Sequence, residues 1–183
     1  SLNMLAMPWI ATGVFIYQSF IAESKLWGKY IIPQSFMIYS ITSILILIAS
    51  GFLVDRFTSR KLIPFMNLPL LLGLIILYFF DLSYSAYLFF GLLGVSNGLA
   101  NVLGASTWAE IYGVRYLGGI RALTTALMVF STAFGTALFG FLIDNGYTID
   151  HIALISIIYI SLSLSLLLMI KRSVEPVNTI KKT

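Results

Sequence analysis

The sequence predicts an all-α membrane protein with six transmembrane helices, and three observations support that prediction. Of the 183 residues, 59% are apolar and only 10% are charged, and the mean hydropathy is +0.97. Soluble domains carry about 25% charged residues, so a water-soluble globule is excluded. The apolar residues also form continuous stretches of about 20, the length of a membrane-spanning helix rather than of a barrel strand.

Six stretches have this length, and they cover residues 4–22, 31–54, 62–80, 84–109, 122–143 and 152–170. None of the 11 basic and 7 acidic residues lies inside a stretch. That distribution is expected of spanning helices, because a charge at mid-bilayer costs about 2.5–3.5 kcal/mol. Residues 1–171 are therefore predicted to form one six-helix transmembrane domain, followed by a disordered cytoplasmic tail over residues 172–183.

Polar residues distinguish the first three stretches. The first carries Tyr17 and Gln18 near its outer end. The second has a polar stripe at the spacing of one helix face, which consists of Ser35, Tyr39, Ser43 and Ser50. The third has a single amide, Asn67, and a proline, Pro69, which is expected to kink the helix.

In the fourth stretch Asn97, Asn101 and Trp108 share one helix face. The aligned residues of the fifth stretch are Thr125, Thr132 and Thr136. The serines of the sixth alternate by two and so scatter around the helix. These patterns predict a bundle in which the first, second, fourth and fifth helices line a cavity, while the third and sixth face lipid.

A structural interpretation of the same residues competes with this one. Hydroxyl side chains bond to their own helix carbonyls, and intramembrane amides hold helices together at about 0.6 kcal/mol per contact. Asn97 and Asn101 are one turn apart and costlier to hide from water, so both interpretations stay open for them. Gly94 and Gly98 form a GxxxG spacing, which predicts close packing of the fourth helix against the fifth.

Basic residues are distributed unequally between the two sides of the predicted bundle. Only Lys25 and Lys29 lie on one side. The other side, which also carries both termini, holds Arg56, Arg60, Lys61, Arg115, Arg121, Lys171, Arg172, Lys181 and Lys182. The positive-inside rule then predicts cytoplasmic termini, and we expect the membrane to be the plasma (inner) membrane. Because these charges are spread over separate connections, they do not indicate a nucleic-acid surface.

Catalytic and metal chemistry lack the residues that they require. The chain has no cysteine, and its one histidine, His151, stands beside Asp150 at the start of the sixth stretch. No nucleophile with a base, and no pair of acids, lies within the stretches. The sequence therefore predicts no enzyme activity, no metal and no cofactor.

The most specific segment is the turn after the second stretch. Gly51 stands four residues before Asp55 and Arg56, and Arg60 and Lys61 precede the third stretch. This turn resembles the GxLxDRxGRR loop of the major facilitator superfamily (MFS) of secondary transporters. Two further segments are similar to that family's connection between the tenth and eleventh helices and to the end of the eleventh, namely WAEIYGVRYLGGIR at 108–121 and GTALFGFLID at 135–144.

The resemblance implies an MFS-type half-bundle, the C-terminal half of a transporter with helices seven to twelve. Its partners would be the lipid bilayer, a small-molecule substrate, and a missing N-terminal six-helix half or a second copy of the chain. The start at Ser1, without an initiator methionine, fits an absent upstream part. Thr58 replaces the family's glycine and Ser59 is an extra residue, which leaves the geometry of the turn open.

Charges near this turn predict a latch that closes when the cytoplasmic helix ends meet, as the family's loop is thought to do in the outward-facing state. The latch residues are Gly51, Asp55, Arg56, Arg60, Lys61, Glu110, Arg115 and Arg121. We expect Gly51 to allow close helix approach, Asp55 to accept hydrogen bonds, and Glu110 to pair with Arg115 or Arg121. Alternatively, these charges only set the topology.

Aromatic rings and amides within the stretches are the candidates for contact with a small organic solute. They are Tyr17, Gln18, Tyr39, Asn97, Asn101 and Trp108. No acid or base lies at mid-bilayer, so Glu23 is the nearest candidate proton carrier. Alternatively, the absent half supplies the group that couples transport to an ion, the solute moves without such coupling, or the solute is neutral. The predicted function is secondary active transport by alternating access, and the alternative is a non-transporting structural or assembly subunit.

Overall fold

The computed structural model describes residues 2–113 and 117–174, and all regular secondary structure in these ranges is helical. The elements are α1 (Leu2–Ile16), α2 (Gln18–Ser24), α3 (Ile31–Arg56), α4 (Ser59–Leu62), the 3-10 helix η1 (Ile63–Phe65), α5 (Leu68–Phe79), α6 (Ser83–Tyr112), α7 (Leu117–Asp144) and α8 (Ile149–Val174). The predicted all-helical class is confirmed.

Four of these helices, α3, α6, α7 and α8, are long and apolar enough to cross a membrane. A fifth span results if α1 and α2 count as one, although a bend of 71° separates them. The apolar segment Ile63–Phe79 is shorter than the others. The described chain is therefore an all-helical protein with four or five helices able to span a membrane.

The first predicted stretch, 4–22, is not one straight helix. It bends at Tyr17, between α1 and α2, and the bend keeps backbone hydrogen bonds from Tyr17 N to Gly13 O (3.0 Å) and from Ile21 N to Tyr17 O (3.1 Å). These two hydrogen bonds satisfy backbone groups on either side of the bend. The bend also redirects α2, which ends next to Lys25.

The third predicted stretch, 62–80, is interrupted rather than kinked. Pro69 stands in the first turn of α5, where its missing N–H costs little, so the expected kink at this residue is wrong. Side chains from other helices bond to the interrupted backbone. Ser96 Oγ accepts from Leu70 N and donates to Met66 O, both at 2.9 Å, and Asn3 Nδ2 donates to Ile63 O at 3.2 Å. Such partners are what allow a broken helix at membrane depth.

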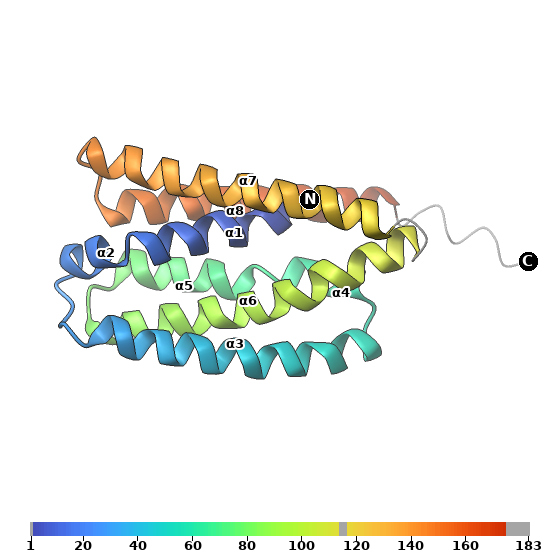
Figure 1. Ribbon diagram of the computed structural model, residues 1–183, viewed down its shortest axis with the longest axis horizontal. Helices are drawn as coiled ribbons and strands as arrows, with labels where there is room; N and C mark the ends of the chain where they lie inside the picture. Colours follow the sequence, from blue (N-terminus) through green and yellow to red (C-terminus); the bar gives the residue numbers. More distant parts are fainter. Residues whose placement is uncertain (1, 114–116, 175–183) are drawn as a thin grey trace, which may run out of the picture.

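The long helices run along the long axis of the bundle, with α1, α7 and α8 on one side and α3, α5 and α6 on the other (Figure 1). The main core contains buried side chains from six helices, among them Ile10, Ile21, Leu74, Phe89, Phe139 and Ile160. We call the end with the α2–α3, α5–α6 and α7–α8 connections the Lys25 end. The opposite end, with the α3–α4 connection, is the Arg121 end.

The principal helix contacts follow a repeated pattern between residues 2–79 and residues 83–174. In this pattern α1, α3 and α5 correspond to α6, α7 and α8. The contact of α3 with α6 then corresponds to that of α1 with α7, and the contact of α5 with α6 corresponds to that of α1 with α8. Two further pairs, α5 with α8 and α1 with α6, join corresponding helices of the two sets, while the contact of α6 with α7 has no comparable counterpart between α1 and α3. Exchanging the two sets therefore preserves the principal pairs, and Figure 1 shows the corresponding helices α1 and α6 running in opposite directions.

Close helix packing occurs at glycines, but with a different partner from the one expected. A Cβ added at Gly94 would lie 2.6 Å from Tyr39 O, and one added at Gly98 would lie 2.8 Å from Ser43 O. Both contacts are with α3, so the predicted GxxxG packing against the fifth helix is wrong. In α7 a Cβ at Gly135 would instead lie 2.7 Å from Trp9 Cα of α1.

Candidate functional site

A cleft of about 370 Å³ opens in the half of the bundle nearest the Arg121 end, and we call it the Asn101 cleft. Its described lining comes from α1, α3, α6 and α7, the four segments whose polar faces predicted a cavity wall. The lining residues are Met4, Met7, Pro8, Ala11, Thr12, Phe15, Tyr39, Asn97, Ala100, Asn101, Gly104, Ala105, Trp108, Arg121, Thr124, Thr125 and Met128. Four predicted solute-contacting residues, Tyr39, Asn97, Asn101 and Trp108, are among them.

The two amides of α6 differ in what they bond to. Asn97 Nδ2 donates to Ser43 Oγ of α3 at 2.8 Å, so this side chain also joins two helices. Asn101 is exposed, and its Nδ2 donates to Asn97 O of its own helix at 2.9 Å. Asn97 therefore combines both interpretations that the sequence left open, whereas Asn101 makes no comparable bond to another described helix.

Two aromatic side chains complete the polar wall of the cleft. Tyr39 is half-buried and packs edge-on against Phe15 of α1, with ring centroids 5.1 Å apart. Trp108 stacks on Tyr112 one turn further along α6, at 6.0 Å and an interplanar angle of 25°. Both rings are thus held in place by neighbouring rings while they line the cleft.

Tyr17, a further predicted solute contact, is directed elsewhere. Its ring stacks on Phe139 of α7, with centroids 6.1 Å apart, and its hydroxyl donates to Thr136 O at 3.3 Å. Gly140 gives the hydroxyl the room it needs, since a Cβ there would approach Tyr17 Oη to 2.5 Å. In the described structure Tyr17 joins α1 to α7 and lies outside the described lining of the Asn101 cleft.

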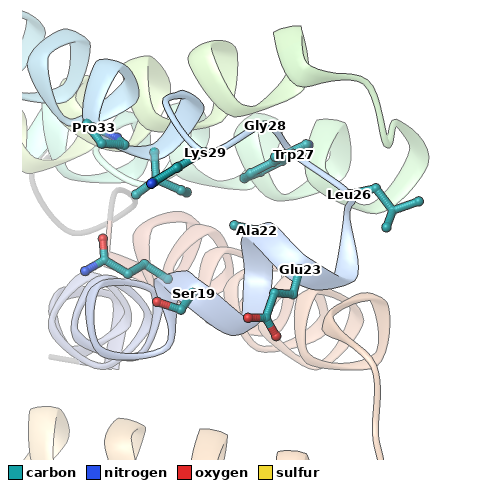
Figure 2. A pocket seen from close by; sticks show the side chains of 10 residues that line it. Ser19, Ala22, Glu23, Leu26, Trp27, Gly28, Lys29 and Pro33 are labelled. Carbon is teal, nitrogen blue, oxygen red and sulfur yellow. The ribbon is translucent and has the colours of Figure 1, made fainter.

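Gln18 and Glu23 line a separate pocket of about 870 Å³ at the Lys25 end, which we call the loop pocket. Figure 2 shows Ser19 and Glu23 of α2 on one side of it and Lys29 and Pro33 on the other. Glu23 is exposed, and it stands well away from the Asn101 cleft. The structure thus places four of the predicted solute residues in the Asn101 cleft, Gln18 and Glu23 in the loop pocket, and Tyr17 in the lining of neither.

The predicted latch residues lie mainly at the surface of the Arg121 end. Asp55 and Lys61 are exposed, and the Arg56 guanidinium lies 5.6 Å from the centroid of the Phe57 ring. A Cβ at Gly51 would have nothing within 4 Å, so no close helix approach occurs there within the described residues. Arg115 and the side chain of Arg60 lie outside the described part. The latch stays a prediction.

Glu110, at the end of α6, contacts the start of α4. Its Oε1 accepts hydrogen bonds from Ser59 N at 2.9 Å and from Ser59 Oγ at 2.7 Å. Ser59 is buried and opens a helix whose first N–H groups have no intrahelical acceptor. A carboxylate is suited to this position because helix N-termini carry partial positive charge. Ser59, an extra residue relative to the family loop, is therefore a structural partner of Glu110.

A charged cluster at the Lys25 end was not anticipated from the sequence. Lys25 Nζ lies 2.6 Å from Asp81 Oδ1 and 2.7 Å from Asp150 Oδ1. The Lys25 side chain is only 2% exposed, against 78% for Asp81 and 45% for Asp150. The indole of Trp27 also donates to Asp81 O at 3.2 Å. We call Lys25, Asp81 and Asp150 the Lys25 clamp, since it joins the α2–α3 and α5–α6 connections to the first turn of α8.

The clamp holds its lysine in the charged form. Burial by itself lowers the pKa of Lys25, but the hydrogen bonds and the attraction to Asp150 and Asp81 outweigh it and raise that pKa above its usual value of 10.5. A signal for this cluster was present in the sequence, because one basic and two acidic residues stand at the ends of stretches that meet on one side of the bundle.

Within the described residues, no group of three or more histidine, cysteine or acidic side chains could hold a metal ion. Comparison of the chain with protein-family models, with curated proteins and with solved structures finds no match.

Proposed function

We propose that this chain is the C-terminal half of a major-facilitator-type secondary transporter, which moves a small organic solute across the plasma (inner) membrane by alternating access. In this proposal the bent pair α1–α2, the broken segment α4–α5, and α3, α6, α7 and α8 make six spans. Both termini of the chain are cytoplasmic, so the Arg121 end faces the cytoplasm.

The observation that carries the proposal is the Asn101 cleft. It gathers amide, hydroxyl and aromatic groups from four helices inside an otherwise apolar bundle. Small-molecule sites have this composition, with mostly apolar walls and a few polar groups that orient the ligand. A volume of about 370 Å³ is at the lower end of ligand pockets, which suits a small solute.

The repeated contact pattern supports the choice of transporter family. Each six-helix half of a major facilitator contains two inverted three-helix repeats. Exchanging residues 2–79 with residues 83–174 preserves the principal helix pairs, and the corresponding helices α1 and α6 run in opposite directions. The Asp55-Arg56 turn between α3 and α4 supports the same choice, because it resembles the family's loop.

The cleft also requires an opposite wall. Of the four unbroken spanning helices, α3 and α7 are the least buried, and both contribute to the cleft. An alternating-access path needs two halves that move against each other around the site. We therefore propose that a second six-helix half, or a second copy of this chain, covers the open side of the cleft.

Solute flux into proteoliposomes tests the proposal. The complete natural protein is reconstituted and supplied with a panel of radiolabelled carboxylates, amides, sugars and amino acids. We expect uptake of at least one solute, and its loss in Asn97→Ala and Asn101→Ala. Asn145→Ala is the matched control, because Asn145 Nδ2 also donates to a carbonyl four residues earlier, Phe141 O at 2.7 Å, but stands outside the described cleft lining.

The alternative is a structural or assembly subunit, for which the polar faces would bind partner helices. That reading predicts no flux of any solute, together with loss of partner association in the Asn97 and Asn101 variants. If flux persists unchanged in both variants, the cleft is not part of the transport path.

A further inference from the structure

The Asn101 cleft contains one residue that is charged at neutral pH among its described lining, and this residue is Arg121. Arg121 lies in the second turn of α7 and is exposed. No carboxylate is among the described lining residues, and Arg121 forms no ion pair with another described residue. The charge of the described cleft is therefore positive and uncompensated.

An uncompensated guanidinium in a cleft with low-dielectric walls determines which solutes can enter. Such walls focus the field of the charge, so anions are concentrated in the cleft and cations are excluded. A guanidinium also presents its N–H groups as a planar fork that matches the two oxygens of a carboxylate. Arg121 thus provides both long-range attraction and a directional contact for an organic acid.

The other lining groups fit the rest of such a solute. Asn101 and Thr125 are polar groups on the α6 and α7 walls, where they can bond to a hydroxyl or carbonyl of the solute. Met4, Met7 and Phe15 of α1 give the lining an apolar part that suits a short hydrocarbon body. The cleft is therefore complementary to a small molecule with an anionic group at one end and an apolar part.

We propose that the Asn101 cleft binds a small organic anion and that Arg121 binds its carboxylate. This inference rests on the proposed function, in which the cleft is the solute site, and it names the class of solute. It also gives Arg121 a different role from the latch expected from the sequence, because Arg121 lines the cleft, whereas Asp55 and Lys61 are outside its described lining.

The test measures binding rather than transport, so that it can fail independently of the proposed function. The complete natural protein is purified in detergent, and its melting temperature is measured with small aliphatic carboxylates, each paired with its own carboxamide. A ligand that binds only the folded protein raises the melting temperature, and the shift grows with the logarithm of its concentration once that concentration exceeds Kd. We expect stabilisation by one or more carboxylates and not by the matched carboxamides.

Variants assign this preference to one side chain. Arg121→Gln is expected to weaken carboxylate binding about ten- to a hundred-fold, the usual effect of losing a hydrogen bond to a charged group. Arg121→Lys is expected to keep part of the affinity and the preference for carboxylates. Lys182→Gln, which removes one positive charge from the C-terminal tail, is the charge-matched control and should bind as the unmodified protein does.

Three results would overturn the inference: no stabilisation by any carboxylate, equal stabilisation by carboxylates and carboxamides, or unchanged carboxylate binding in Arg121→Gln. The first two need only the unmodified protein, so misfolding of a variant cannot hide them. Flux of a neutral solute without preference for anions would retain the transport proposal and reject the anion. Arg121-dependent anion binding without flux of any solute would retain the inference about the anion and reject the transport proposal.

Discussion

The two ends of the bundle hold their charges in opposite ways. At the Lys25 end a lysine side chain, 2% exposed, bonds to two carboxylates from distant segments. At the Arg121 end Asp55, Arg56 and Lys61 are exposed, and Arg121 lines an open cleft without an ion pair to a described residue. One end therefore has its connections joined by a buried ion-paired lysine, and at the other end most of the described charges are exposed.

This difference indicates which parts of the chain move together. The clamp ties the α2–α3 connection to the segments at the starts of α6 and α8, so we expect these three parts of the chain to move together. Exposed charges near the Arg121 end are positioned to meet another surface. In the proposed transporter, the Lys25 end would maintain the half-bundle while the other end opens and closes against the second half.

Removing the clamp lysine is expected to have the largest effect on stability. Lys25→Met leaves Asp81 and Asp150 close together without their shared cation. The free energy of unfolding should fall by about 2 kcal/mol. This is less than for a fully buried pair, because both carboxylates are partly exposed. Thermal unfolding in detergent measures it. Lys29→Met, a change on the same connection at an exposed lysine, is the control, and an equal loss in both variants would contradict the role of the clamp.

The clamp also has a predictable pH dependence. Since the pKa of Lys25 is raised in the folded state, its contribution to stability is fully present below 10.5 and is lost as pH rises through the higher folded value. The difference in melting temperature between the unmodified protein and Lys25→Met should thus be constant up to 10.5 and shrink above it. A difference that already shrinks between neutral pH and 10.5 would argue against this assignment.

A smaller effect is expected at the contact between Glu110 and Ser59. Glu110→Ala removes the acceptor of a buried backbone N–H and of the Ser59 hydroxyl, at a cost of about 1 kcal/mol. Glu110→Gln keeps an acceptor oxygen, so its stability should fall by about half as much. Unfolding measurements on the two variants separate hydrogen bonding from charge, and identical stability in all three proteins would show that this contact contributes little.

The smallest effect on stability is expected for a substitution of Asp55. This substitution should instead change the balance between the conformations of the protein. Asp55→Asn alters an exposed residue, so its stability should change by less than about 0.5 kcal/mol. As a latch residue, however, it should shift the complete protein towards inward-open conformations. The ratio of labelling from the two sides of the membrane, measured on a cysteine in the cleft, reports this shift. An unchanged ratio would leave Asp55 as a topology-setting charge.

Much of the fold could be predicted because apolar length and charge placement are local properties. Each predicted stretch corresponds to one long helix or to a succession of shorter ones. The alignment of Asn97, Asn101 and Trp108 at helical spacing was also sufficient to place them on one wall of the cleft. Periodicity determines which face of a helix a residue occupies, and a cleft wall is built from such faces.

Features that depend on distant residues could not be predicted in this way. The GxxxG spacing indicates that a close neighbour exists, but only the tertiary structure shows that this neighbour is α3. The interruption before α5 depends on Ser96 and Asn3, which are far from it in sequence. Lys25 counted only as a loop charge, because pairing with Asp81 and Asp150 requires three distant segments to meet.

Two-sided access to the Asn101 cleft tests the central claim most directly. The chain has no cysteine, so Ala105→Cys, on the cleft wall, places a reporter in a cysteine-free form of the complete protein. Leu72→Cys, exposed on α5 in a predicted lipid-facing span, is the control. Alternating access predicts that a membrane-impermeant maleimide labels position 105 from either side of the membrane and position 72 from neither. Labelling of position 105 from one side only would contradict the account.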